Sequence, residues 1–177
     1  GKKDVLILGN KIAAIEENIS VDMNGSVDVM EIDGTGKALV PGFIDSHVHI
    51  LGGGGEGGYA TRTPEIKLTD LTTAGVTTVV GCLGTDGISR DMVALLAKAR
   101  GLEEEGITTF IYAGSYRIPV KTITGSIMKD IMVVDKIIGI GEVAISDHRS
   151  SQPTFDEFCR DVSDARVGGM LSGKAGI

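Results

Sequence analysis

The sequence predicts an α/β protein in which a small β-rich lobe precedes about four βα units. From Phe43 onward, short apolar stretches alternate with helix-like stretches, and the apolar stretches start about 30 residues apart, the length of a βαβ unit. These stretches are apolar nearly throughout, as expected for parallel strands buried on both faces. The pattern fits part of a parallel barrel or a doubly wound sheet. A complete (β/α)₈ barrel needs about 250 residues, more than the 177 of this chain.

The N-terminal lobe is predicted from short alternating stretches. Its strand candidates are residues 4–8, 11–16 and 26–32. Gly9-Asn10 supplies a turn of the hairpin kind between the first two, and Asp33-Gly34 ends the third. We therefore expect a first domain at residues 1–42 and a second at residues 43–177.

The second domain is expected to alternate strands and helices. The strands are predicted at residues 43–49, 76–82, 107–113 and 137–143, and the helices at residues 64–74, 89–106, 125–135 and 154–167. The second helix has the clearest signal, because Ser89 is a suitable N-cap, Gly106 a suitable C-terminal stop, and apolar residues recur between them at helical spacing. Another strand is expected to begin within the glycine-rich residues 168–176.

Composition argues against several classes of partner. The net charge is −7, and Lys and Arg are scattered, which disfavours a nucleic-acid or anionic-membrane partner. No apolar run approaches the roughly 20 residues of a membrane span, and residues 5–8 are too short for a signal peptide. Cys82 and Cys159 show no metal or redox spacing and are interpreted as reduced thiols. Together these features predict a cytoplasmic protein.

The most informative stretch is Asp45-Ser-His-Val-His49. Side chains alternate along a strand, so Asp45, His47 and His49 should share one face, where the two imidazoles could bind one divalent ion. The pair lies at the C-terminal end of the first strand of the second domain, where barrels place their chemistry, and includes two of only three histidines. A chance His-x-His pair is the alternative.

These residues carry a resemblance to a known family. Residues 41–49, Pro-Gly-Phe-Ile-Asp-Ser-His-Val-His, resemble the opening of the metal-dependent amidohydrolase superfamily. Further blocks are similar to the isoaspartyl (β-aspartyl) dipeptidases in particular, at residues 52–56, 62–65, 83–86, 122–126 and 146–150. The resemblance spans essentially the whole chain. It implies the N-terminal part of such an enzyme: a partial (β/α)₈ TIM-like barrel of about four βα units, preceded by part of a small β-sandwich domain.

The resemblance also implies a metal site. His47 and His49 would bind the first ion, and a complete active site would hold two Zn²⁺ ions. Glu142, at the end of the fourth predicted strand, stands where the best-known relatives carry a carboxylated lysine that bridges the metals. This is a departure from the family pattern, although a glutamate already has the carboxylate. A structural, salt-bridged Glu142 is the alternative.

Substrate residues follow from the same resemblance. Residues 52–58 are all glycine except Glu56, which would bind the α-ammonium of a β-aspartyl residue. This run formally matches a dinucleotide fingerprint, but no helix signal follows it. Arg149 would bind a substrate carboxylate with its planar fork. Tyr116 would polarise the scissile carbonyl, and Thr85 would line the same pocket. Packing or surface roles are the alternatives for each.

The function implied is metal-dependent hydrolysis of β-aspartyl dipeptides, a small-molecule substrate class. The family's general-base Asp and two further metal-binding histidines have no counterpart in this chain, so we expect an inactive, truncated fragment of a protein that is a homo-oligomer when intact. The alternatives are a cyclic-amide hydrolase of the dihydroorotase or hydantoinase kind, and a non-catalytic scaffold. Serine-hydrolase chemistry is disfavoured, because no Gly-x-Ser-x-Gly occurs.

Overall fold

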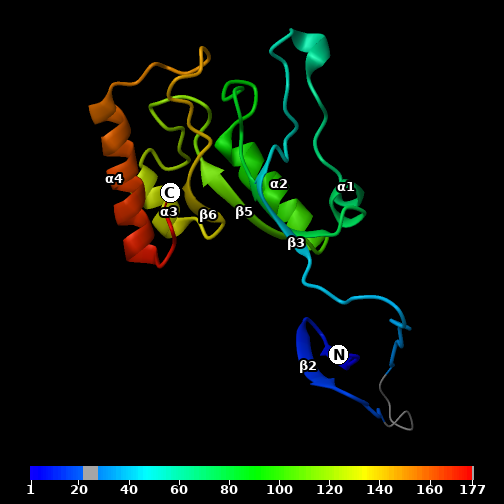
Figure 1. Cartoon of the computed structure of the whole chain (residues 1–177). Coiled ribbons are helices and arrows are strands. Elements are labelled where there is room, and N and C mark those ends of the chain that lie inside the picture. Colours follow the sequence, from blue (N-terminus) through cyan, green and yellow to red (C-terminus); the bar gives the residue numbers. More distant parts are fainter. Residues whose placement is uncertain (22–27, 177) are drawn as a thin grey trace. The chain divides into compact units, whose positions relative to one another are not determined.

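Two sheets, one antiparallel and one parallel, organise the chain (Figure 1). A computed structural model describes residues 1–21 and 28–176. The chain divides into two units, Gly1–Val40 and Pro41–Ile177, each with its own sheet.

The first unit contains a β-hairpin at the predicted place. Strands β1 (Asp4–Leu8) and β2 (Lys11–Glu16) pair antiparallel about the Gly9-Asn10 turn. The prediction of a third strand at residues 26–32 is wrong for residues 28–32, which form no strand; residues 26 and 27 lie outside the described part. The alternation there buries no face, since Met30 and Ile32 are 86% and 79% exposed. A hairpin alone is not a sandwich, so that assignment stays a prediction.

The second unit is built on a four-stranded parallel sheet. Its strands are β3 (Phe43–Val48), β4 (Val76–Gly81), β5 (Thr108–Ala113) and β6 (Ile137–Ile140). They lie side by side in chain order, and every neighbouring pair is parallel. This arrangement confirms the α/β class and fits part of a TIM-like barrel.

Four α-helices connect and follow these strands. They are α1 (Leu68–Thr72), α2 (Met92–Glu104), α3 (Ile127–Val133) and α4 (Phe155–Ser172), with a short 3₁₀ turn, η1, at Tyr59–Thr61. Each of the first three packs against the strand that follows it, and α4 packs on α3 and β6 (Figure 1). No helix in the described part of the chain is both long and apolar enough to cross a membrane.

Several predicted boundaries differ from the observed ones. The N-cap of α2 is Asp91, whose carboxylate accepts a bond from the Ala94 amide, while Ser89 bonds Asp86 instead. Strand β6 ends at Ile140 because its partner β5 ends at Ala113, opposite it.

The glycine-rich C-terminal segment also differs from its prediction. Residues 168 and 169 continue α4, where Gly168 lies so close to α3 that an added Cβ would be 3.0 Å from the Met128 Cα. Only Gly176 pairs with the sheet, in a parallel bridge to Gly139.

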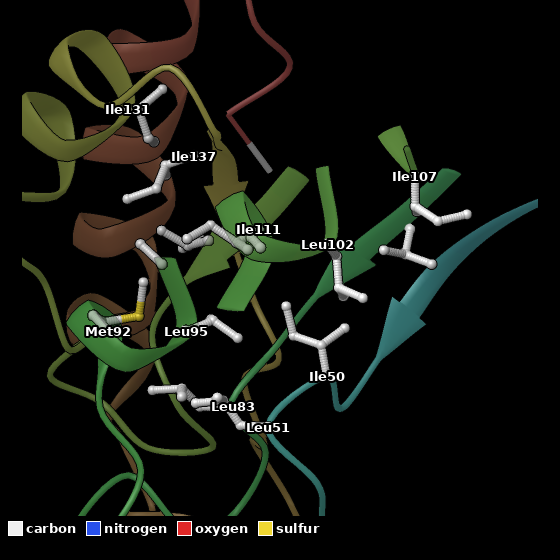
Figure 2. Close-up of a cluster of buried hydrophobic side chains, with 14 of the residues drawn as sticks. Ile50, Leu51, Leu83, Met92, Leu95, Leu102, Ile107, Ile111, Ile131 and Ile137 are labelled. Atoms are coloured by element: carbon white, nitrogen blue, oxygen red, sulfur yellow. The ribbon is translucent and has the colours of Figure 1, made fainter. Parts of the chain in front are cut away.

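The core fills the space between the helices and the parallel sheet (Figure 2). Ile50, Leu51 and Leu83 gather at one end of this cluster, and Ile131 and Ile137 at the other (Figure 2). Ile50 is 0% and Leu83 is 1% exposed, and each directly follows a residue with metal-binding chemistry. Burial of these two side chains therefore orients their neighbours, since successive side chains of an extended chain point in opposite directions.

Candidate active site

Four side chains with metal-binding chemistry meet at one edge of the parallel sheet. His47 lies near the end of β3 and His49 just after it, Cys82 directly follows β4, and Glu142 lies two residues beyond β6. The carboxyl ends of parallel strands share an edge, and barrels place their sites there. One ligand atom from each of the four lies within 4.8 Å of the other three.

Glu142 is the centre of this cluster. Its Oε2 atom lies 3.1 Å from the His47 Nε2 and 3.6 Å from the His49 Nε2. The predicted metal residues are therefore brought together, which their positions 95 residues apart in the chain did not guarantee. Asp45, predicted to share their face, accepts a bond from the His47 amide at 3.1 Å and stands outside the cluster.

Sequence reasoning missed Cys82 as a member of this site. Its Sγ lies 3.8 Å from the His49 Nδ1 and 3.9 Å from the Glu142 Oε2. Burial, followed by the nearby Glu142 carboxylate, raises the pKa of the Cys82 thiol to about 12. Like His49 and Glu142, Cys82 comes just after a strand of the parallel sheet, but this position alone does not show that its side chain faces the other two.

Gly84 leaves the space that the His49 ring occupies. An added Cβ there would lie 2.5 Å from the His49 Cε1 and 2.8 Å from its Nδ1, and the backbone φ is +72°. Its carbonyl also accepts a bond from the Tyr116 amide at 3.0 Å. Gly84 thus affects the position of two candidate site residues, the ligand His49 and the substrate residue Tyr116.

The donor set fits a divalent metal ion. Imidazole nitrogens, a carboxylate oxygen and a sulfur are the ligands that zinc takes in proteins, whereas magnesium and calcium prefer oxygen alone. His47, His49 and Glu142 are the residues that would hold the ion, with their ligand atoms already converging.

The glycine loop brings Glu56 to the same edge. Its Oε1 accepts hydrogen bonds from the Thr85 hydroxyl at 2.8 Å and from the Arg149 Nη1 at 3.2 Å. The Thr85 bond is the main reason that the pKa of Glu56 lies below its usual range, with Arg149 adding to the effect. Glu56 is therefore an ionised carboxylate with a fixed orientation.

Arg149 connects the substrate candidates to one another. It donates to the Tyr116 hydroxyl at 2.9 Å, and its guanidinium carbon lies 4.8 Å from that ring's centroid. Its fork holds Asp147 through two bonds of 2.9 Å, which keeps the pKa of Asp147 far below its usual range. Part of the fork expected to bind substrate is thus bonded within the loop. His148, the third histidine of the chain, is 88% exposed at its side chain and lies outside the cluster.

A second arginine, not anticipated from sequence, fixes the glycine loop. Arg90 is only 6% exposed and donates to the carbonyls of Leu51, Gly53 and Thr63 at 3.0 to 3.2 Å. Asp86 lies 3.6 Å from its Nη1. Glu56 thus stands on a loop tied down at both of its ends.

These groups line one pocket. Its walls are His49, Gly53, Gly54, Glu56, Leu83, Thr85, Asp86, Arg90, Tyr116, Glu142 and Arg149. The pocket therefore joins candidate metal ligands to a carboxylate and a guanidinium, which suits a small zwitterionic ligand.

Two solved structures are similar to the whole chain. The chain is 60% identical, over its whole length, to the β-aspartyl dipeptidase of the thermophilic, keratin-degrading Fervidobacterium islandicum AW-1, with a TM-score of 0.90. The structure of that enzyme in complex with β-Asp-Leu gives a TM-score of 0.89 at the same identity. The predicted resemblance to the β-aspartyl dipeptidases is confirmed. The chain spans 48% and 46% of those two chains, so it matches about half of such an enzyme.

The curated relatives that the chain matches are dihydroorotases. It is 31% identical over 148 residues to a dihydroorotase of Caldanaerobacter subterraneus and 46% identical over 54 residues to a dihydroorotase of Listeria monocytogenes. These matches span 31% and 12% of the relatives' lengths. No protein-family model matches the chain. The dihydroorotase matches are weaker and shorter than those to the β-aspartyl dipeptidases, which share the chain's full length.

Proposed function

We propose that this chain carries the first metal site and the substrate-ammonium site of a β-aspartyl dipeptidase. The observation that supports this most directly is the convergence of His47, His49 and Glu142 beside an ionised Glu56. Sixty per cent identity to a β-aspartyl dipeptidase over the whole chain supports the same assignment. The Gly1–Val40 unit would then belong to a small β-sandwich and the Pro41–Ile177 unit to the first half of a barrel.

Metal binding is assigned to His47, His49 and Glu142, with zinc as the expected ion. A bound zinc would polarise the amide carbonyl and lower the pKa of a bound water to about 7. Among the described residues, no arginine or lysine forms an ion pair with Glu142. Its carboxylate is therefore free to bind a metal ion. This feature favours the ligand role over the structural salt bridge.

Substrate binding follows from charge. A β-aspartyl dipeptide has one α-ammonium and two carboxylates, and Glu56 is the ionised group that suits the ammonium. Thr85 fixes the Glu56 carboxylate by donating to its Oε1. Arg149 would bind a substrate carboxylate through its Nη1, in place of the Glu56 Oε1 that this atom contacts at 3.2 Å, since Asp147 occupies the Nε and Nη2 side.

Tyr116 would stabilise the carbonyl oxygen during reaction. Its hydroxyl oxygen accepts a bond from Arg149, which leaves its own proton available to donate. A donor that simultaneously accepts a charged hydrogen bond is strengthened by polarisation. The Tyr116 hydroxyl is therefore suited to donate a hydrogen bond to the amide carbonyl oxygen, which gains negative charge during the reaction.

Proton transfer needs a group that these residues do not supply. The cluster and pocket of the described chain contain no carboxylate besides Glu56, Asp86 and Glu142, and each has another assigned partner. We therefore propose that the chain binds β-aspartyl dipeptides but does not hydrolyse them unaided.

The test is calorimetric titration of the zinc-loaded chain with β-Asp-Leu and with α-Asp-Leu, together with an assay for released leucine. We expect the β isomer to bind at least about tenfold more tightly, corresponding to about 1.4 kcal/mol, with no leucine release. Glu56→Gln should weaken the binding of β-Asp-Leu by at least about tenfold, because the variant lacks the carboxylate that suits the α-ammonium. Glu65→Gln should not, because Glu65 pairs with Lys98 outside the pocket. Equal binding of both isomers would contradict the assignment.

The curated dihydroorotase relatives support one other candidate, cyclic-amide hydrolysis. A cyclic amide carries no α-ammonium, so it gives Glu56 no partner. Dihydroorotate in the same titration separates the two functions: binding that is stronger than that of β-Asp-Leu would favour the cyclic-amide candidate.

A further inference from the structure

Cys82 occupies a position that packing alone does not explain. It is 1% exposed, and its amide donates to the Val48 carbonyl at 2.9 Å, which fixes the residue beside the end of β3. Leu83, the next residue, enters the apolar core, so Cys82 points the opposite way. A buried cysteine that acts as a small hydrophobe faces apolar side chains. The Cys82 sulfur instead faces His49, Glu142 and the Val48 carbonyl.

The spacing of the cluster matches a single four-ligand site. Bonds of about 2.0–2.3 Å in a tetrahedral zinc site separate the ligand atoms by about 3.3–3.7 Å. Here the Glu142 Oε2 lies 3.1 Å from the His47 Nε2 and 3.9 Å from the Cys82 Sγ, and one ligand atom from each of the four residues lies within 4.8 Å of the other three. Small side-chain movements would bring all four atoms to one ion.

We propose that Cys82 is a fourth protein ligand, so that His47, His49, Cys82 and Glu142 bind one zinc ion as a thiolate-containing site. The inference rests on the proposed metal binding by the other three residues. On ligation the Cys82 S–H bond is replaced by a sulfur–metal bond, the proton leaves to solvent, and the metal keeps its 2+ charge. No oxidant or reductant takes part.

The composition of this site sets its selectivity and its coordination. A thiolate favours zinc, cobalt and cadmium over magnesium and manganese, which prefer oxygen ligands. Four protein ligands also close the coordination sphere, as in structural zinc sites, whereas catalytic sites keep a position open. The site would therefore retain one ion tightly in this chain, and the proposed polarisation of an amide carbonyl would require the release of one protein ligand.

Cobalt substitution tests the ligand directly, because a thiolate bound to Co²⁺ gives a near-ultraviolet charge-transfer band and tetrahedral Co²⁺ gives intense visible bands. The chain is titrated with Co²⁺ as wild type, Cys82→Ser and Cys159→Ser. Cys159 is the matched control, because it is exposed on α4 and outside the cluster. We expect the charge-transfer band in wild type and Cys159→Ser, and its complete loss in Cys82→Ser with at least about tenfold weaker Co²⁺ binding.

Two other outcomes separate the inference from the proposed function. Visible cobalt bands that depend on His47 and Glu142 but lack the charge-transfer band would overturn Cys82 ligation alone. Absence of cobalt binding to the wild-type chain would overturn the metal site itself. Circular dichroism of Cys82→Ser and Cys82→Ala shows whether each variant is folded, and a folded variant that keeps the band would also overturn the proposal.

Discussion

Gly84→Ala tests how the fold positions the candidate metal ligands. An L-residue at a φ of +72° costs about 1–2 kcal/mol. The new Cβ would also lie 2.5 Å from the His49 Cε1, where ordinary contacts begin at 3.4 Å, so the ring must move by about 0.9 Å (3.4 − 2.5). Zinc sites tolerate errors of about 0.2 Å in ligand distance. We therefore expect zinc affinity to fall at least about 100-fold, and the free energy of unfolding to fall by about 2 kcal/mol.

Gly173→Ala is the matched control for this variant. Gly173 has a φ of +70° after α4, and an added Cβ there meets nothing within 4 Å. It should therefore lose about 1 kcal/mol of stability and no zinc affinity. Zinc affinity is measured by competition with a chromophoric chelator, and stability by urea unfolding. If Gly84→Ala binds zinc as tightly as Gly173→Ala does, the contact between Gly84 and His49 does not position the ligand.

Three further substitutions and one control test the side chains that hold the glycine loop, the loop before α3 and the Glu56 carboxylate. Arg90→Met removes the donors to three loop carbonyls and should cost about 3 kcal/mol in urea unfolding, whereas Arg100→Met, at an exposed pair, should cost under about 1 kcal/mol. Asp130→Asn should lower the free energy of unfolding by about 2 kcal/mol, because the buried carboxylate accepts three hydrogen bonds at 2.6 to 2.8 Å. An unchanged free energy of unfolding would show that the Asn amide replaces the carboxylate fully. Thr85→Val should raise the pKa of Glu56 towards 4.5, as followed by carboxyl NMR. Since the folded pKa is lowered, wild type loses this stabilisation as the pH falls below about 4.5, and the variant should lose less.

The strand pattern was predictable because apolar stretches recur at the spacing of a βαβ unit, although β3 itself is largely exposed, with Ile44 at 71%. The starts of β3, β4 and β6 lie at the predicted residues, and β5 begins one residue later than predicted. Element ends were less predictable, since they depend on partners. Strand β6 ends where β5 ends, and α2 begins at Met92 with Asp91 as its N-cap, because Asp86 binds Ser89. Such contacts are not visible in local sequence.

The site was predictable where residue type alone indicates chemistry. His47, His49 and Glu142 could be selected as candidate ligands, and the structure places them together. Cys82 and Arg90 could not be selected, because their positions depend on the register of β4 against β3 and on the path of the glycine loop. Asp147, which holds the Arg149 fork, was likewise evident only from geometry.

The most direct test of the central claim is the zinc content of the purified chain. Wild type and a His47→Ala/His49→Ala double variant are dialysed extensively and analysed by inductively coupled plasma mass spectrometry. We expect about one zinc ion per wild-type chain and almost none in the folded double variant. A wild-type chain without zinc, or equal zinc in both proteins, would contradict a metal site at the ends of these strands.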